Sequence, residues 1–207
     1  MKLETGSNTT QFTHKVSIQL ALDGHSFSSR TLQVLDALTA DQEAVEVELL
    51  TRCTMLVPTA LFDAADASAL LAANGMPAAA DEVTVFSDPH PEGVAVMALS
   101  AKVMRRIADK LGDRTHFTSP LLCVPSSMTE ATVWLRCEAR LLYIKVYDGE
   151  LRFAEVLPVA TDADVLYFFE RLGREFTLAN YQLHLTGDQR ASVRKLLGKR
   201  FKRVLCE

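Results

Sequence analysis

Residues 142–153 read LYIKVYDGELRF, and residues 16–27 read VSIQLALDGHSF. Each stretch consists of an alternating apolar segment, the pair Asp-Gly and a second extended segment. Asp-Gly between alternating segments is a strong signal for a β-hairpin, because a type I′ turn needs positive φ at both central residues. Each half of the chain is therefore predicted to open a sheet of antiparallel strands, with helices following.

The second half continues the pattern with alternating helices and strands. We predict three consecutive strands at about 131–137, 140–147 and 150–157, followed by a helix that starts at Thr161 and ends at Gly173. A strand at 181–185, a helix that Asp188 caps and that runs to Leu197, and a strand at 201–206 complete this half. Three ribbons followed by this alternation give a mixed sheet with right-handed crossovers. This is the element order of a ribonuclease-H-like unit.

The first half shows a less regular version of the same order. We predict strands at 16–22, 25–34, 45–49, 54–57, 83–86 and 93–99, a short helix after Pro58, an Ala-rich helix at 66–74 and a helix that Ser100 caps. Two such units in tandem form the arrangement of actin, sugar kinases and the heat-shock ATPases. The predicted fold class is therefore α/β, with mixed α+β sheets in a duplicated, two-lobed, actin-like ATPase fold. We place the lobes at 15–118 and 119–207, after a disordered tail at 1–14.

Composition and charge limit the possible functions. The 207 residues are 48% hydrophobic and carry a net charge of −4, which argues against a general nucleic-acid or anionic-membrane binder. Residues 1–14 lack the apolar run of a signal peptide, and no segment has the roughly 18 apolar residues of a membrane span. We therefore expect a cytoplasmic protein.

The four cysteines, Cys53, Cys123, Cys137 and Cys206, are far apart in the sequence. Their spacing gives neither a C-x-x-C redox pair nor a zinc knuckle. Because free cysteine behaves as a small hydrophobic residue, we expect reduced, buried thiols.

Five short stretches occur in an order that resembles a known family. They are residues 16–27, LVPTALF at 56–62, YDGEL at 147–151, DVLYF at 164–168 and LTGD at 185–188. Together they resemble a Bacteroidetes family, number 3822 among the domains of unknown function, over roughly 16–206. The resemblance implies a fold similar to actin-like ATPases and trimmed loops in the first half. That family has no established activity, so the resemblance leaves the function open.

Actin-like ATPases hold nucleotide between their lobes, on a phosphate loop from the first β-turn of each lobe and a Gly pair against the adenosine. The first turn here contains Asp23 and Gly24, but a tight hairpin leaves no extended loop, and Gly24 is explained by its tolerance of positive φ. The matching turn of the second half, residues 137–140, has no Gly. The adenosine position has one Gly, in Thr186-Gly187-Asp188, where Asp188 is expected to cap the next helix. We therefore do not expect ATP hydrolysis or a cofactor.

Other catalytic patterns are weaker. The sequence has no P-loop string and no Gly-x-Ser-x-Gly elbow. Asp88, His90 and Glu92 alternate in one loop and could bind a metal, but the intervening prolines indicate a stiff, solvated loop. Glu46 and Glu48 are expected to form a solvated face of a strand, which argues against a two-metal nuclease site.

Two further features concern binding. The C-terminal region is strongly basic, with Arg190, Arg194, Lys195, Lys199, Arg200, Lys202 and Arg203. It is either a solvated helix face or a docking patch for an acidic partner or nucleic acid, with Arg194, Lys199, Arg200 and Lys202 as the candidate contacts. Tyr143, Lys145 and Tyr147 share one strand face, which is expected to lie under a helix or to line the cleft between the lobes.

Three hypotheses remain. The first is a non-catalytic protein that binds an unidentified protein partner or acts as a scaffold, without nucleic acid or membrane. The alternative is a nucleotide-binding ATPase or kinase-like enzyme with an atypical cleft, for which Asp23, Gly24, Thr186, Gly187 and Asp188 are the cofactor-binding candidates. The third is a structural subunit that assembles through sheet edges or its basic C-terminus. The sequence leaves the oligomeric state open.

Overall fold

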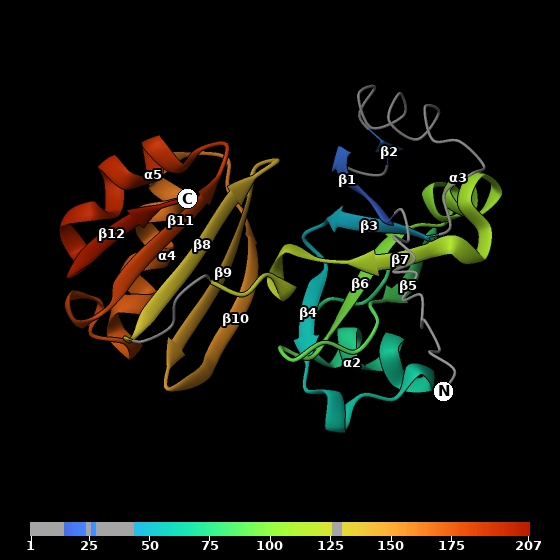
Figure 1. The fold of residues 1–207 in the computed structure, drawn as a ribbon, viewed down its shortest axis with the longest axis horizontal. Coiled ribbons are helices and arrows are strands. Elements are labelled where there is room, and N and C mark those ends of the chain that lie inside the picture. Colours follow the sequence, from blue (N-terminus) through green and yellow to red (C-terminus); the bar gives the residue numbers. More distant parts are fainter. Residues whose placement is uncertain (1–14, 24–25, 28–43, 126–129) are drawn as a thin grey trace, which may run out of the picture.

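The structure, a computed structural model, describes residues 15–23, 26–27, 44–125 and 130–207. Figure 1 shows two bodies side by side, joined by a crossover segment. We call the described residues up to Thr118 the N-terminal body and residues 130–207 the C-terminal body. The tail predicted at 1–14 lies outside the described residues.

The C-terminal body contains one five-stranded sheet. Its strands are β8 (Thr132–Glu138), β9 (Leu141–Asp148), β10 (Glu150–Pro158), β11 (Gln182–Gly187) and β12 (Arg203–Cys206). Their order in the sheet is β10-β9-β8-β11-β12, in which the first two pairs are antiparallel and the last two are parallel. The five predicted strands are confirmed, with ends that differ by no more than two residues.

The two turns of this meander differ from the prediction. Ala139 and Arg140, between β8 and β9, have φ values of 49° and 60°, which is the backbone that a type I′ turn requires. At Asp148-Gly149, between β9 and β10, only Gly149 has positive φ, at 75°. The antiparallel pairing of β8 with β9 holds Ala139 and Arg140 in this strained backbone conformation. The turn with two positive φ values therefore lies at Ala139-Arg140, and not at Asp148-Gly149 as the sequence had indicated. Gly24 of the first hairpin lies outside the described residues.

Two helices, α4 (Asp162–Glu175) and α5 (Arg190–Leu197), pack through their apolar sides against this sheet. Thr161 Oγ1 accepts a hydrogen bond from the Asp164 backbone N–H, and the Asp164 carboxylate accepts one from the Thr161 N–H, which confirms the predicted capping box. The prediction that Gly173 ends α4 is wrong, because Gly173 keeps the helical path. The prediction that Asp188 caps α5 is also wrong: β11 runs on to Gly187, and Gln189 takes the N-cap position without a side-chain cap.

The N-terminal body contains two sheets rather than one. β2 (Ser26–Phe27), β1 (Lys15–Asp23), β3 (Ala44–Leu50) and β7 (Thr115–Thr118) form the first sheet in that order, with β1, β3 and β7 parallel. β4 (Thr54–Val57), β6 (Val94–Ser100) and β5 (Glu82–Phe86) form a separate antiparallel sheet. A bend at Arg52-Cys53 ends β3 and directs the chain into this second sheet. The first sheet, β2-β1-β3-β7, has the same pairing order as β9-β8-β11-β12, one antiparallel pair followed by two parallel pairs, whereas the sheet of β4, β6 and β5 has no described counterpart in the C-terminal body. The strand predicted at 25–34 is described only at Ser26–Phe27.

The helices of the N-terminal body follow the prediction closely. They are α2 (Ala67–Ala73) and α3 (Ala101–Leu111), and the Ser100 side chain caps α3 by accepting a hydrogen bond from the Lys102 N–H.

Short 3-10 turns occur in both bodies and between them. They are η1 (Thr59–Leu61), η2 (Ala64–Asp66), η3 (Gly112–Arg114), η4 (Pro120–Leu122), η5 (Leu178–Asn180) and η6 (Gly198–Arg200). η4 lies in the crossover between the bodies.

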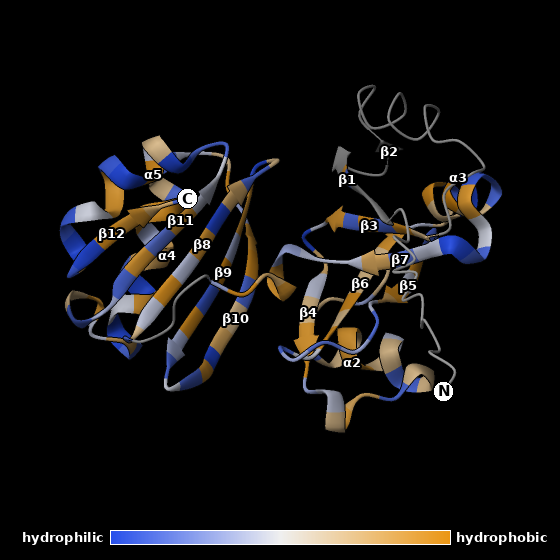
Figure 2. Cartoon of the chain, viewed as in Figure 1, coloured by the Kyte–Doolittle hydropathy of each residue, from blue (hydrophilic) through white to orange (hydrophobic). Residues whose placement is uncertain are grey.

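Apolar side chains form a core inside each body and a further cluster between the bodies. Figure 2 shows β4 and β6 largely in the hydrophobic colour, and every residue of β6 is buried. The cluster between the bodies joins Leu50 and Leu121 to side chains of the C-terminal sheet, namely Trp134, Leu141, Tyr143, Tyr147 and Val156. The predicted Tyr-Lys-Tyr face of β9 therefore packs in the space between the two bodies. Of the helices in the described part of the chain, none has the length and hydrophobicity that a membrane crossing needs.

Candidate functional site

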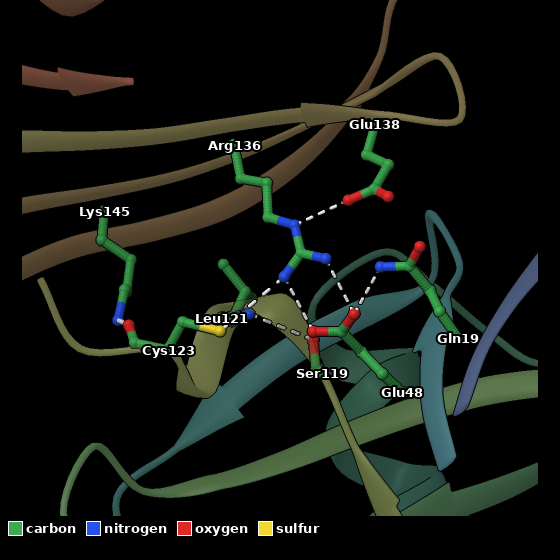
Figure 3. A network of polar contacts seen from close by, with 8 residues as sticks. All are labelled: Gln19, Glu48, Ser119, Leu121, Cys123, Arg136, Glu138 and Lys145. Carbon is green, nitrogen blue, oxygen red and sulfur yellow. Dashed lines mark hydrogen bonds and ion pairs between the residues drawn. The ribbon is translucent and has the colours of Figure 1, made fainter. Parts of the chain in front are cut away.

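The space between the two bodies is the candidate site, and an ion-pair network crosses it. Arg136 on β8 donates through Nη1 and Nη2 to the two carboxylate oxygens of Glu48 on β3, at 2.8 Å each. Arg136 Nε also donates to Glu138 at 2.7 Å, and the Gln19 amide donates to Glu48 at 2.6 Å. Figure 3 shows Arg136 reaching across from one body to the carboxylate of the other. Such a bidentate pair fixes both distance and angle between the two strands.

Glu48 is therefore not part of a solvated face, as the alternation of β3 had predicted. The side chains of Glu48 and Arg136 are only 14% and 16% exposed, because the C-terminal body covers this side of β3. Burial alone lowers the pKa of Arg136, but the paired Glu48 and Glu138 carboxylates outweigh it and raise that pKa above its ordinary value. Arg136 is therefore charged throughout the physiological pH range.

A second polar bridge lies beside the first. Lys145 on β9, fully buried, donates to the Glu92 carboxylate at 3.0 Å and to the backbone carbonyl of Cys123 in the crossover. The Tyr147 hydroxyl donates to the same Glu92 oxygen. Burial lowers the pKa of Lys145, against the opposing effect of Glu92, and burial next to Glu92 raises the pKa of Tyr147. The Lys145 ammonium also lies over the Trp134 and Tyr147 rings, 5.1 and 5.3 Å from their centroids.

The loop that could have bound a metal serves this second bridge instead. Glu92 faces Lys145, whereas Asp88 accepts a hydrogen bond from, or pairs with, His116 at 2.8 Å. His90 forms backbone hydrogen bonds with Gly93. Within the described residues, no three His, Cys, Asp or Glu side chains are grouped as metal ligands. The loop at 88–92 therefore places the Glu92 carboxylate at the interface between the bodies.

The residues predicted for nucleotide binding are only partly assembled. Thr186 and Gly187 of β11 are register partners of Arg136 and Cys137, so they lie beside the ion-pair network. Gly187 has a φ of +88°, and a Cβ there would lie 2.3 Å from the Cys137 carbonyl oxygen. Its lack of a side chain is therefore explained by close backbone packing. Asp188 is exposed and belongs to the turn after β11, whereas Asp23 ends β1 and its partner Gly24 is outside the described residues.

A small crevice of about 270 Å³ remains between the bodies. It is bounded by the segment that follows β3, by the start of α3 at Ser100 and by the β8–β9 turn at Ala139. The β8–β9 turn corresponds to the predicted second phosphate position, and it contributes Ala139, not a Gly, to the lining of the crevice.

The predicted burial of the thiols is correct for only one of the four. Cys137 is buried and its burial raises its pKa to about 12, Cys53 and Cys123 are half-buried, and Cys206 is exposed. Cys123 Sγ lies 3.8 Å from Arg136 Nη1. Since all four are free thiols, the reduced state was predicted correctly.

The basic C-terminal region forms an exposed face on α5, η6 and the segment leading into β12. Arg194, Lys199 and Arg200 are exposed, and the described contacts give them no acidic partner. Lys202 differs, because its ammonium pairs with Glu130 at 2.8 Å. Residues 189–206 contain seven Lys and Arg and no acid, which leaves 15 cations against 26 acids in the rest of the chain. In Figure 1 this face lies at the end of the molecule remote from the N-terminal body. The structure therefore brings three of the four predicted contacts together as free cations.

Sequence patterns did not predict the interface network. Arg136 and Lys145 are charged residues in the interior of strands that are otherwise largely apolar and whose other charged residue stands at the strand end. That pattern is the available signal, because an isolated charge in a buried strand requires a partner. It does not identify the partner, which here lies 88 residues away for Arg136 and 53 for Lys145.

No family model matches the chain, and no curated protein does. Among solved structures, the chain is similar to a Bacteroides thetaiotaomicron protein described as having an actin-like ATPase fold and unknown function. The TM-score is 0.72 at 16% identity, over 99% of this chain and 94% of that one. The cytoplasmic domain of EpsL, an inner-membrane component of the type II secretion system of Vibrio cholerae, aligns over 84% of this chain and 81% of its own at 13% identity. Its TM-score of 0.42 is too low to support an argument. The first likeness shows the fold, a mixed α/β structure of the actin-like ATPase type.

Proposed function

We propose that this protein is a non-catalytic, cytoplasmic partner-binding protein built on a duplicated actin-like fold, with lobes at 15–118 and 119–207. The proposal includes the predicted relationship to the Bacteroidetes family, which is supported by the similar fold of the Bacteroides thetaiotaomicron protein. One observation carries it: the space where relatives of this fold hold nucleotide is crossed by the bidentate pair of Arg136 and Glu48.

Three features of the interface support this proposal. The ion pair fixes β8 against β3, Lys145 and Glu92 fix β9 against the loop before β6, and apolar side chains fill the space between them. An actin-like nucleotide site needs backbone N–H donors from both bodies that are oriented toward the phosphates. Here Arg140 occupies the turn of the C-terminal body, and Gly187 is committed to packing on β8. The two bodies are thus joined as a fixed unit.

The basic face is the proposed docking surface for a protein partner. Its free cations, Arg194, Lys199 and Arg200, stand on a protein that is otherwise strongly acidic, so an acidic protein surface complements it. A nucleic acid is less well matched, because Phe201, the aromatic residue of this segment, is buried and cannot stack on bases. Lys202 contributes charge from within its pair with Glu130.

A thermal shift with Mg·ATP tests the absence of nucleotide binding. A ligand at a hundredfold over its Kd stabilises the folded state by about 2.7 kcal/mol. For 150–250 residues this raises Tm by about 5–10 °C. We expect no shift beyond that caused by Mg²⁺ alone. A rise of several degrees that saturates with nucleotide would instead support the alternative, an ATPase or kinase-like enzyme with an atypical cleft.

The docking surface has its own test. We expect Arg194→Glu with Arg200→Glu to abolish capture of a native partner, and we expect capture by the unaltered protein to weaken as salt is raised. The control reverses two exposed cations of α3, Lys102→Glu with Arg105→Glu, which keeps the change in net charge equal. Equal loss of capture in both variants would refute the assignment to the basic face.

A further inference from the structure

β12 is an edge strand whose outer side has no strand partner among the described residues. It ends the five-stranded sheet, and its register partners, residues 182–185, all lie on β11. The other edge strand of this sheet, β10, packs against β4 of the N-terminal body, whereas Figure 1 shows β12 on the side remote from that body. The edge of β12 is therefore open to another chain, and an open edge presents unpaired backbone N–H and C=O groups.

The register of β12 identifies which of its backbone groups point outward. The Glu207 N–H donates to the Leu185 carbonyl at 3.0 Å, and Leu185 is the register partner of Cys206. In a parallel ladder, the N–H and C=O of one residue point to the same side of the strand, and successive residues alternate. Residues 205 and 207 therefore face β11, and the N–H and C=O groups of Val204 and Cys206 point away from the sheet. These outward groups can pair with an added strand.

Apolar side chains border this edge on both faces of the sheet. Val204 packs on the helix side, where its Cγ2 lies 3.8 Å from the Cβ position of Gly198 in η6. Leu205 points to the opposite face, because successive side chains of a strand alternate. Both side chains are only partly buried, so each leaves apolar surface beside the open edge. A strand added there would place its own side chains alternately on these two faces.

Cations flank the same edge on both faces. On the helix side, the Cβ position of Gly198 is also 4.0 Å from Arg194 Cγ, which places this cation of the basic face on the side of Val204. Arg200 lies in η6, which leads into β12. Arg203 is exposed and, by the alternation of the strand, shares the face of Leu205. The basic face and the open edge therefore adjoin.

We propose that β12 binds an extended, acidic segment of the partner protein by strand addition. The inference rests on the proposed function, because it assigns a binding mode to the partner of the basic face. Main-chain hydrogen bonds to Val204 and Cys206 supply affinity, and the neighbouring side chains select the sequence, as in other complexes formed at a sheet edge. Acidic side chains of the segment lie beside Arg200 and Arg203, and its apolar side chains lie beside Val204 and Leu205.

Charge identifies the occupant as an acidic segment rather than a second copy of this chain. The acids at the two ends of β12 are already engaged: Glu130 pairs with Lys202 at 2.8 Å, and a Glu207 carboxylate oxygen lies 3.5 Å from His184 Nδ1. Residues 189–206 contain seven Lys and Arg and no acid. Pairing the β12 edges of two copies would bring two such sets of cations together, and positive charges on an edge strand oppose pairing of that kind. An acidic strand meets the opposite charge instead.

A phage-displayed library of random nine-residue peptides tests the proposal. Selection on the full chain is expected to enrich sequences that combine Asp or Glu with apolar residues and lack Pro. Cys206→Pro removes an outward N–H and changes no charge, and edge strands accept proline where the N–H faces solvent. Binding of the enriched peptides is expected to fall at least tenfold in Cys206→Pro and to be unchanged in Cys206→Ala, which keeps that N–H. No enrichment, or equal binding to the two variants, would overturn the proposal.

A second measurement needs no variant. Hydrogen exchange of the unaltered protein with a selected peptide is expected to slow the Val204 and Cys206 amides at least tenfold and to leave residues 153–157 of β10 unchanged. Without peptide, the exchange of these two amides is expected not to depend on protein concentration. Unchanged amides at β12 with peptide, or slowing that grows with protein concentration alone, would overturn the proposal, the latter in favour of a second copy as the occupant.

The charge-reversed variant Arg194→Glu with Arg200→Glu separates this inference from the proposed function. It is expected to lose the enriched peptides as Cys206→Pro does. If the charge reversal abolishes binding and Cys206→Pro leaves it intact, strand addition is refuted and the basic face remains the docking surface. If Cys206→Pro abolishes binding and the charge reversal does not, the acidic occupant and the basic face are both refuted.

Discussion

Arg136→Met removes one partner of the ion pair between the two bodies and leaves the Glu48 carboxylate at the interface. Both side chains are nearly buried, at 16% and 14% exposed, so this is closer to a buried than to a surface pair. Breaking a buried pair by removing one partner costs about 3–5 kcal/mol, whereas exposed pairs contribute about 0–1 kcal/mol. We take about 3 kcal/mol, because some solvent reaches the pair.

The expected result is a fall in Tm of about 6–12 °C for a chain of this size. The matched control is Arg152→Met, which makes the same chemical change at a pair with Glu150 whose side chains are 55% and 73% exposed. That variant is expected to lower Tm by no more than about 4 °C. The assay is thermal unfolding followed by circular dichroism, with urea unfolding as a check on the free energy.

The double variant Arg136→Met with Glu48→Leu separates an unpaired charge from lost packing. Replacing both members of a buried pair by apolar groups is often neutral, so the double variant is expected to recover most of the lost stability. The reasoning is refuted if Arg136→Met costs no more than Arg152→Met, or if the losses from the two single changes simply add in the double variant.

Three further changes test other parts of the structure. Gly149→Ala is expected to lower the free energy of unfolding in urea by about 1–2 kcal/mol, and Gly187→Ala is expected to lower it by well over that amount. Both positions have positive φ, but only at Gly187 would the added Cβ meet a carbonyl oxygen. Equal losses in the two variants would contradict this. Backbone hydrogen bonds at the start of α4 lower the pKa of Asp164, so the stabilisation by its carboxylate is present above the ordinary pKa of 3.8 and is lost as the pH falls below it. The difference in unfolding free energy between the unaltered protein and Asp164→Asn, measured across pH, should therefore shrink at acid pH and not at neutral pH. Glu92→Gln is expected to lower the free energy of unfolding by about 3–5 kcal/mol at neutral pH, because it removes the carboxylate that pairs with the Lys145 ammonium. Burial lowers the pKa of Lys145, so this loss should shrink as the pH rises toward 10.5. A loss that does not depend on pH would contradict the pairing.

Local patterns predicted most of the elements but not how the first half is arranged in space. The capping box at Thr161 and the cap at Ser100 depend on residues within one helical turn, so the sequence contained all the necessary information. The end of α4 depended on packing, since Leu178 lies 3.6 Å from the Cβ position of Gly173 and the helix continues past this glycine. The separation of the N-terminal strands into two sheets depends on long-range pairing that alternation does not encode.

The candidate site shows the same limit. Alternation correctly placed Val45 and Val47 in the core, but it assigned Glu48 to solvent because the second body that covers β3 is formed by residues far along the chain. The Tyr-Lys-Tyr face of β9 was expected to lie under a helix or to line the cleft, and the structure supports the second of these alternatives. Its function as a bridge to Glu92 required the folded arrangement.

Nuclear magnetic resonance of the arginine Nη–H groups observes the junction between the bodies most directly, because Arg136 Nη1 and Nη2 donate across it to Glu48. The account predicts Arg136 Nη–H signals that exchange with water far more slowly than those of the exposed Arg152, and that keep their positions when millimolar Mg·ATP is added. Arg136 Nη–H signals that exchange as fast as those of Arg152, or that shift and saturate with nucleotide, would show that the bodies separate and that the space between them accepts a ligand.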